Sequence, residues 1–108
     1  MRGLIFASTW ERGIGVLKAI IKIKSHCNVN CIRTVKTKQK TYAEFDDGSR
    51  WDVVGCSDHI RGRKWHECYV DRYFSQDMVD NIVKPCAFPS YSPYFDSSTP
   101  LERRIHYF

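Results

Sequence analysis

The order of apolar and polar residues at the start of the chain predicts a buried strand followed by a helix. Residues 4–7 form a continuous apolar run that is too short for a helix, which is typical of a strand covered on both faces. Ser8 and Glu11 then stand three residues apart, as in a capping box, and predict a helix over about residues 9–24. Its apolar positions repeat at helical spacing and are Ile14, Leu17, Ile20 and Ile21.

The pattern changes in the middle of the chain, where β-branched and aromatic residues become frequent. Three segments of this kind, residues 32–37, 41–45 and 51–54, predict strands, and the turn residues 46–49 separate the last two. Because the connections are short, we expect these strands to pair antiparallel as a meander. A further strand is predicted at residues 66–70, after a polar loop.

A second helix is predicted after the last of these strands. Ser75 is suited to cap its N-terminus, Asp77 suits its first turn, and Pro85 is expected to end it. The apolar positions of this helix are Met78, Val79, Ile82 and Val83. The chain beyond it is rich in proline, serine and tyrosine up to Thr99, and residues 101–108 suit a closing strand or a helical turn.

Strands that alternate with helices define the α/β class. We expect a small sheet of about five mixed strands with two main helices, in two or three layers, and at least two strands parallel across helical crossovers. Residues 1–86 are predicted to form a single domain. The Pro/Ser/Tyr-rich residues 87–108 are predicted to form a C-terminal extension that packs on this domain.

Composition narrows the class of protein. The 108 residues are 43% hydrophobic and 14% aromatic, which is enough to close one core and excludes a disordered chain. No apolar run approaches the roughly 20 residues of a membrane-spanning helix, so we expect a cytoplasmic protein with no membrane partner. The five cysteines are an odd number and favour reduced thiols over a disulfide framework. The formal charge of +5 favours acidic or phosphate-bearing partners.

Three motifs in the middle of the chain follow one another in a specific order. A turn of the form Phe-x-x-Gly-Ser-Arg occupies residues 45–50, a Ser-Asp-x-x-Arg-Gly loop occupies residues 57–62, and a hydrophobic strand ends in Asp71. This order and spacing resemble the ATPase core of phage large terminase subunits, the motors that package DNA. The resemblance extends loosely upstream to residues 4–9 and downstream to residues 76–84. It implies a fold similar to a truncated P-loop ATPase core.

The same resemblance implies a role for Asp71. In terminases the strand that ends in aspartate is the Walker B element, so Asp71 would be a catalytic residue and the ligand of the Mg²⁺ that accompanies ATP. A carboxylate at the carboxyl end of a buried strand lies where open α/β sheets bind ligands. This interpretation expects Asp71 to be accessible at the edge of the sheet. The alternative is that Asp71 only caps the turn into the next helix.

Two features depart from a complete ATPase. No Gly-x-x-x-x-Gly-Lys-Ser/Thr loop is present, and the nearest segment, from Gly13 to Lys18, has the wrong spacing. Arg72 stands where an acidic residue usually adjoins the Walker B aspartate, and a cation cannot act as a general base. We therefore expect the chain to be inactive alone. Mg²⁺ and ATP would bind only if a partner chain of the motor supplies the phosphate-binding loop.

A basic loop precedes the last predicted strand. Arg61, Arg63 and Lys64 stand beside Trp65, and this combination of cations with an aromatic residue is suited to DNA phosphates. The sequence therefore predicts these three residues as a nucleic-acid-binding site. The alternative is a solvated loop whose tryptophan packs into the core.

Two short pairs of residues have the types that bind zinc. Cys27 with Cys31, and Cys56 with His59, could supply four ligands to a tetrahedral ion. Against zinc, the Cys-x-x-x-Cys spacing is looser than usual, and isolated cysteines in strands are commonly small apolar fillers. The pattern therefore disfavours Zn²⁺ as a cofactor.

Two functions remain open from the sequence. The first is a fragment or degenerate relative of a viral DNA-packaging terminase ATPase, acting with partner chains in or on the motor. The second is a small phage-type protein that binds or inhibits a host or viral protein target without nucleotide chemistry, with or without a stabilising zinc. Either protein would act in the cytoplasm, which is that of the host cell if the protein is viral.

Overall fold

The computed structural model describes residues 1–37, 39–55, 63–88 and 101–108, the side chains of residues 101 and 102 excepted. In chain order, the elements are β1 (Arg2–Phe6), α1 (Trp10–His26), β2 (Cys31–Lys36), β3 (Thr41–Phe45), β4 (Arg50–Val54), β5 (Glu67–Val70), α2 (Gln76–Met78), η2 (Val79–Val83), η3 (Lys84–Cys86), η4 (Leu101–Arg104) and β6 (Ile105–Tyr107).

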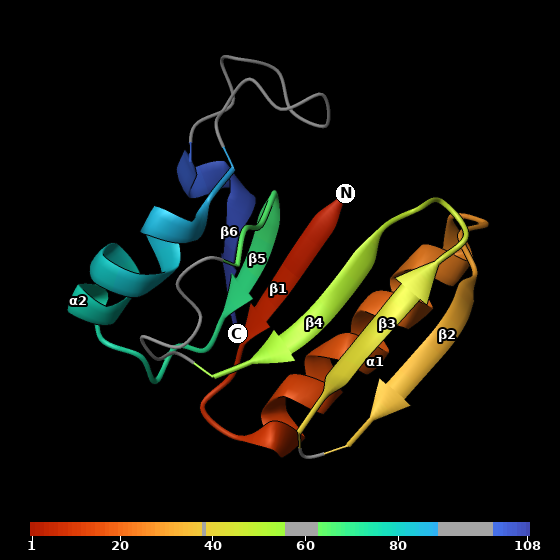
Figure 1. Cartoon of the computed structure of the whole chain (residues 1–108), viewed down its shortest axis with the longest axis horizontal. Helices are drawn as coiled ribbons and strands as arrows, with labels where there is room; N and C mark the ends of the chain where they lie inside the picture. Colours follow the sequence, from red (N-terminus) through yellow and green to blue (C-terminus); the bar gives the residue numbers. More distant parts are fainter. Residues whose placement is uncertain (38, 56–62, 89–100) are drawn as a thin grey trace.

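One six-stranded mixed sheet runs through the molecule in the order β2-β3-β4-β1-β5-β6 (Figure 1). β2, β3 and β4 pair antiparallel, as the predicted meander requires. β1 pairs parallel with both β4 and β5, and β5 pairs parallel with β6. The predicted α/β class is therefore confirmed. The sheet exceeds the expected five strands because residues Ile105–Tyr107 add a sixth strand at one edge.

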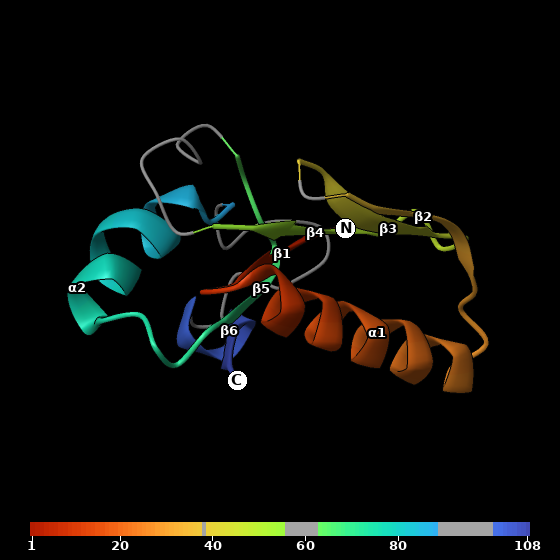
Figure 2. The same cartoon turned by 90° about the horizontal axis from the view of Figure 1, so that it is seen from below.

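The helices lie on opposite faces of the sheet and on opposite halves of it (Figure 2). One core lies between α1 and the sheet, and its buried members are Ile5, Leu17, Ile20, Ala43, Phe45 and Trp51. The other core lies between the segment from α2 to η3 and the opposite face, and includes Leu4, Phe6, Trp65, Val70, Val79 and Val83. Within the described part of the chain, no helix covers the face of β2, β3 and β4 that points away from α1. The α1-side face of β5 and β6 is likewise without a helix (Figure 2).

β1 is an inner strand that contributes to both cores. Ile5 points to the α1 side, whereas Leu4 and Phe6 point to the other side, and all three side chains are buried. Because successive side chains of a strand alternate between faces, a strand covered on both faces must be apolar throughout. The continuous apolar run at the start of the chain has this cause.

α1 has a different N-cap from the one that the capping box predicts. Thr9 is the N-cap residue, and its side-chain oxygen accepts a hydrogen bond from the backbone N–H of Arg12 at 3.2 Å. The hydroxyl of Ser8 instead donates to the carboxylate of Asp71. The predicted capping role of Ser8 is therefore wrong, because a carboxylate from another strand is the stronger acceptor for that hydroxyl.

The second helix is less regular than its apolar stripe predicts. Ser75 caps it as expected, since its hydroxyl oxygen accepts from the N–H of Met78 at 3.3 Å. The chain then continues as a π-helical turn over Val79–Val83 and as a 3-10 turn over Lys84–Cys86. The helical segment ends at Cys86, one residue after Pro85, and Ala87 is extended. The end of the helix therefore lies within one residue of the end that Pro85 predicts.

Candidate functional site

Asp71 follows β5 directly, at the carboxyl end of the parallel strands β1, β5 and β6. Its backbone N–H donates to the carbonyl of Phe6 at the end of β1, at 2.9 Å. Its side chain has 0% of its surface exposed. The expectation that Asp71 is accessible at the edge of the sheet is therefore wrong, although the preceding segment is a strand as predicted.

Five hydrogen bonds surround the Asp71 carboxylate within the described chain. Arg12 donates from Nε to Oδ2 at 2.7 Å and from Nη2 to Oδ1 at 3.1 Å. Ser8 donates to Oδ2 from its hydroxyl at 2.6 Å and from its backbone N–H at 3.0 Å. The backbone N–H of Tyr73 donates to Oδ1 at 3.1 Å. The carboxylate thus joins the end of β1, the first turn of α1 and the turn after β5.

These donors determine the protonation state of Asp71. Burial by itself raises the pKa of this carboxyl, but the hydrogen bonds from Arg12 and Ser8 outweigh burial and hold the pKa well below its ordinary value. The group is therefore ionised at neutral pH and paired with a guanidinium. A divalent cation would reach it only by displacing Arg12, so the geometry is that of a structural ion pair. The catalytic and Mg²⁺-binding roles of Asp71 stay predictions.

Two departures from the ATPase pattern, Arg72 and the segment from Gly13 to Lys18, both lie within the described chain. Arg72 is exposed, and its backbone N–H donates to the carbonyl of Phe108 at 2.7 Å. The segment from Gly13 to Lys18 lies inside α1, so its amide groups bond within the helix and do not face a phosphate. Gly13 has a packing role there, because a Cβ at this position would clash with the side chain of Val53.

The predicted zinc ligands are only partly within the described chain. Cys27 is exposed just after α1, and Cys31 is half-buried at the start of β2, with its Sγ 3.0 Å from Oγ1 of Thr34. Cys56 and His59 lie outside the described residues. Among the residues that are described, no three His, Cys, Asp or Glu side chains form a metal-binding group. The zinc hypothesis is therefore untested.

The predicted basic loop is also described only in part. Arg61 lies outside the described residues, whereas Arg63 and Lys64 are both exposed. Nη1 of Arg63 is 3.4 Å from a carboxylate oxygen of Asp52, which lies in β4. Trp65 is fully buried, and its Nε1 donates to a backbone carbonyl at 2.8 Å. This tryptophan therefore belongs to the core and is not available for stacking on a base.

Further basic side chains gather around the ring of Tyr42. The cationic group of Arg50 lies 3.8 Å from the ring centroid, that of Lys40 lies 5.3 Å away and that of Arg33 lies 5.8 Å away. Tyr42 itself is only 3% exposed beneath them. We call the group of Arg33, Lys40, Arg50 and Arg63 the basic face.

Strand register brings the basic face together. Ala43 and Phe45 of β3 point to α1. Because side chains alternate along a strand, Tyr42 and Glu44 point to the opposite side, which no helix covers in the described chain. Tyr42 is paired with Asp52 in β4, so their side chains share this face. Arg63 reaches the same face through its contact with Asp52.

The carboxylates of this face do not balance its cations. Nε of Arg50 is 2.8 Å from Oδ1 of Asp52, and Nη1 of Arg50 is 3.4 Å from Oε1 of Glu44. Four basic residues thus stand against two acidic ones, which leaves an excess of two positive charges among the described residues of the face. The excess of cations on this surface of the sheet therefore favours a negatively charged ligand.

Of the basic face, the sequence alone predicts only Arg63, as part of the loop of Arg61, Arg63 and Lys64. Arg33, Lys40 and Arg50 are not predicted. Their signal was the alternation of side chains in the predicted meander. That alternation shows which residues share a face, but the register that aligns three strands comes only from the structure.

Comparison of the chain with protein-family models, with curated proteins and with solved structures finds no significant match. The fold and the sites define the class of protein as a small α/β domain with a mixed sheet, an internal Arg–Asp pair and a basic sheet face. None of the helices in the described ranges is long and apolar enough to cross a membrane.

Proposed function

We propose that the chain is a nucleic-acid-binding protein that does not hydrolyse ATP on its own, a degenerate relative of a terminase ATPase that acts in or on a viral DNA-packaging motor. The observation that carries DNA binding is the convergence of Arg33, Lys40, Arg50 and Arg63 on one sheet face. The order of the sequence motifs supports the packaging context. Its partners would be DNA and other motor chains, in the cytoplasm of the host cell.

The arrangement of the cations indicates what kind of contact they make. Arg33 and Lys40 are exposed, and neither has a carboxylate partner among the described residues, so both can bind phosphates. Arg50 and Arg63 share the carboxylate of Asp52, which fixes their positions. Because the ring of Tyr42 is buried under the cations, no base can stack on it. The face would therefore bind the sugar-phosphate backbone independently of sequence.

Fluorescence anisotropy with labelled duplex DNA of about 20 base pairs, at about 50 mM salt, tests this proposal. Replacing Arg33 and Lys40 together by alanine is expected to weaken binding about tenfold, because two phosphate contacts are lost. The control replaces Lys18 and Lys22, which are exposed on α1, by alanine. It removes the same charge and should change the affinity by less than about twofold. Equal weakening by the two double variants would reject the basic face as the binding site.

A second candidate is an ATPase completed by a partner chain that supplies a phosphate-binding loop. The position of Asp71 favours it, because parallel strands flank β5 at the edge where open α/β sheets bind ligands. This function requires Arg12 to release the carboxylate. Titration calorimetry with Mg²⁺, ATP and packaging-motor chains tests this function. If no heat of binding is observed with any such chain, the function is rejected.

A further inference from the structure

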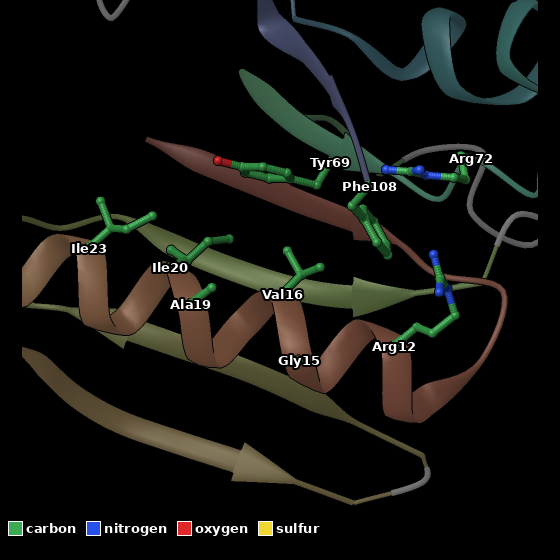
Figure 3. A pocket seen from close by; sticks show the side chains of 9 residues that line it. All are labelled: Arg12, Gly15, Val16, Ala19, Ile20, Ile23, Tyr69, Arg72 and Phe108. Carbon is green, nitrogen blue, oxygen red and sulfur yellow. The ribbon is translucent and has the colours of Figure 1, made fainter.

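A groove of about 430 Å³ lies between α1 and the uncovered side of β5 and β6 (Figure 3). Val16, Ile20 and Ile23 project into it from α1, and Tyr69 of β5 and Phe108 form the opposite wall. Ile23 is 58% exposed, which is high for a large apolar side chain beside other apolar groups. Most of the groove therefore presents apolar surface to solvent.

One end of the groove contains two arginines. Figure 3 shows Arg12 and Arg72 at this end, next to Phe108. Arg12 is held by Asp71 and lies 5.5 Å from the ring centroid of Phe108. The side chain of Arg72 is exposed and forms no ion pair with another described residue. An occupant of the groove would therefore meet an unpaired cation at this end.

Gly15 leaves a flat spot on the surface of α1 in the groove, and no contact within the described chain requires a glycine there. A Cβ at Gly15 would meet nothing within 4 Å, whereas a Cβ at Gly13, two residues earlier, would clash with β4. A glycine inside a helix costs about 1 kcal/mol relative to alanine. No contact within the described residues compensates for this cost at Gly15. A flat helix surface at this point, followed by Ala19 one turn later, allows another backbone to approach closely.

The length of the groove fits a helix of about three turns. Its α1 wall extends from Arg12 to Ile23, which corresponds to about 16 Å, or three helical turns, at 1.5 Å per residue. A helix in this place would extend the α1 layer across β5 and β6, on the sheet face that lacks a helix in the described part of the chain (Figure 2). Amphipathic helices commonly bind in apolar grooves of this kind through residues spaced three and four apart.

The positive charge of α1 indicates which kind of partner helix the groove would favour. Arg12, Lys18, Lys22 and Lys24 stand on α1 against a single acidic residue, Glu11. A second copy of this chain would bring the same cations against each other. We propose that the groove binds an amphipathic helix of a partner protein, with an apolar stripe against α1 and acidic residues at the end that meets Arg12 and Arg72. This protein-binding site is separate from the basic face and does not depend on the DNA-binding proposal.

Three synthetic peptides of about 15 residues test the proposal. All carry the same helical leucine stripe; the first has glutamates beside it, the second has lysines there, and the third is the glutamate peptide with two central prolines that prevent a helix. NMR titration of the isotope-labelled full chain should show binding of the glutamate peptide, with shifts confined to α1, β5 and Phe108. Its affinity should exceed that of the other two peptides by at least about tenfold.

Substitutions in the groove sharpen this test. Ile23→Asp should weaken binding of the glutamate peptide about tenfold, and because Ile23 is exposed the fold should be kept, as circular dichroism checks. Arg72→Gln should weaken only the glutamate peptide, by about threefold. Gly15→Ala should weaken binding while raising the melting temperature, which a purely structural role of Gly15 would not produce. The matched control is Lys36→Gln, exposed in β2 outside the groove, which should change the affinity by less than about twofold.

Several results would overturn the helix-docking proposal. These are no binding of any peptide, equal binding of the glutamate and lysine peptides, or full affinity of Ile23→Asp. A dimer in sedimentation that Ile23→Asp dissociates would assign the groove to a second copy. Binding of dodecanoate in the groove without any peptide would assign it to a small apolar acid. The Arg33 and Lys40 double variant should bind the glutamate peptide normally, so a failure here is distinct from a failure of DNA binding.

Discussion

At the scale of single residues, the carboxylate of Asp71 connects elements that are far apart in the chain. Arg12 and Ser8 bind it from 59 and 63 residues away. A buried ion pair contributes little when compared with well-packed apolar residues, but the removal of one partner is costly because it leaves a polar group without its bond. We therefore expect Asp71 to matter for stability more than for chemistry.

Asp71→Asn is expected to lower the free energy of unfolding by about 3 kcal/mol at neutral pH, because its amide NH₂ would face the donors of Arg12 and Ser8. The difference in the free energy of unfolding between the wild type and Asp71→Asn should become smaller in acid. The folded-state pKa of Asp71 lies below its ordinary value of 3.8, so the wild type keeps this stabilisation above about pH 4 and loses it as the pH falls through the folded pKa. Urea unfolding at about pH 7, 4 and 2 measures both effects.

Asp77→Asn is the matched control, since Asp77 is exposed in the first turn of α2. It should change the free energy of unfolding by no more than about 0.5 kcal/mol. A deficit of Asp71→Asn that stays constant from neutral to acidic pH would show that the carboxylate charge is not what stabilises the fold.

At the scale of elements, α1 contains two glycines with opposite roles. Gly13 is buried and allows the helix to lie close to Val53 of β4. Gly15 is exposed and has open space where its side chain would be. Both positions are equally weak in helix propensity, so only the surroundings distinguish them.

Gly13→Ala is expected to lower the free energy of unfolding by about 1–3 kcal/mol, because the methyl group overlaps Val53. Gly15→Ala is expected to raise it by about 0.5–1 kcal/mol, because alanine restricts the unfolded chain and meets no neighbour. Thermal unfolding followed by circular dichroism measures both variants. A change of the same sign in the two would contradict the packing described for α1.

Most elements could be predicted from the local pattern of apolar and polar residues, because that pattern reflects which side chains of a segment are buried. The apolar run at residues 4–7, the helical stripe after it and the aromatic strands all have this origin. The hydrogen bond of Ser8 could not be predicted, since its partner Asp71 follows β5, 63 residues away in the chain. The π turn at Val79–Val83 likewise leaves no local pattern, because an apolar stripe tolerates a change of helix type.

The candidate site was predictable only to the extent that its residues are neighbours in the chain. Asp71 was placed correctly after a strand, but the Arg12 that binds it has no fixed spacing to it. Arg63 was selected from its basic neighbours, whereas Arg33 and Lys40 join it through strand pairing. A site whose residues come together through strand pairing can be predicted only when the order and register of the strands are known. The hydrophobic pattern of the sequence does not give that order.

At the scale of the whole molecule, positive charge is divided between two surfaces of the sheet. The net charge of +5 alone predicts an acidic or phosphate-bearing partner without placing it. The basic face lies on one side of β2, β3 and β4, and the groove with Arg12 and Arg72 lies on the α1 side. The two proposed partners, DNA and an amphipathic acidic helix, would therefore not compete for the same surface.

The salt dependence of DNA binding tests the central claim most directly. The logarithm of the binding constant falls with the logarithm of the salt concentration by about 0.9 for each phosphate that a protein neutralises. With two phosphate contacts, from Arg33 and Lys40, we expect a slope of about −2 for the wild type, and most of this slope should be lost when both residues are alanine. A slope near zero, or one that this double variant leaves unchanged, would contradict the account.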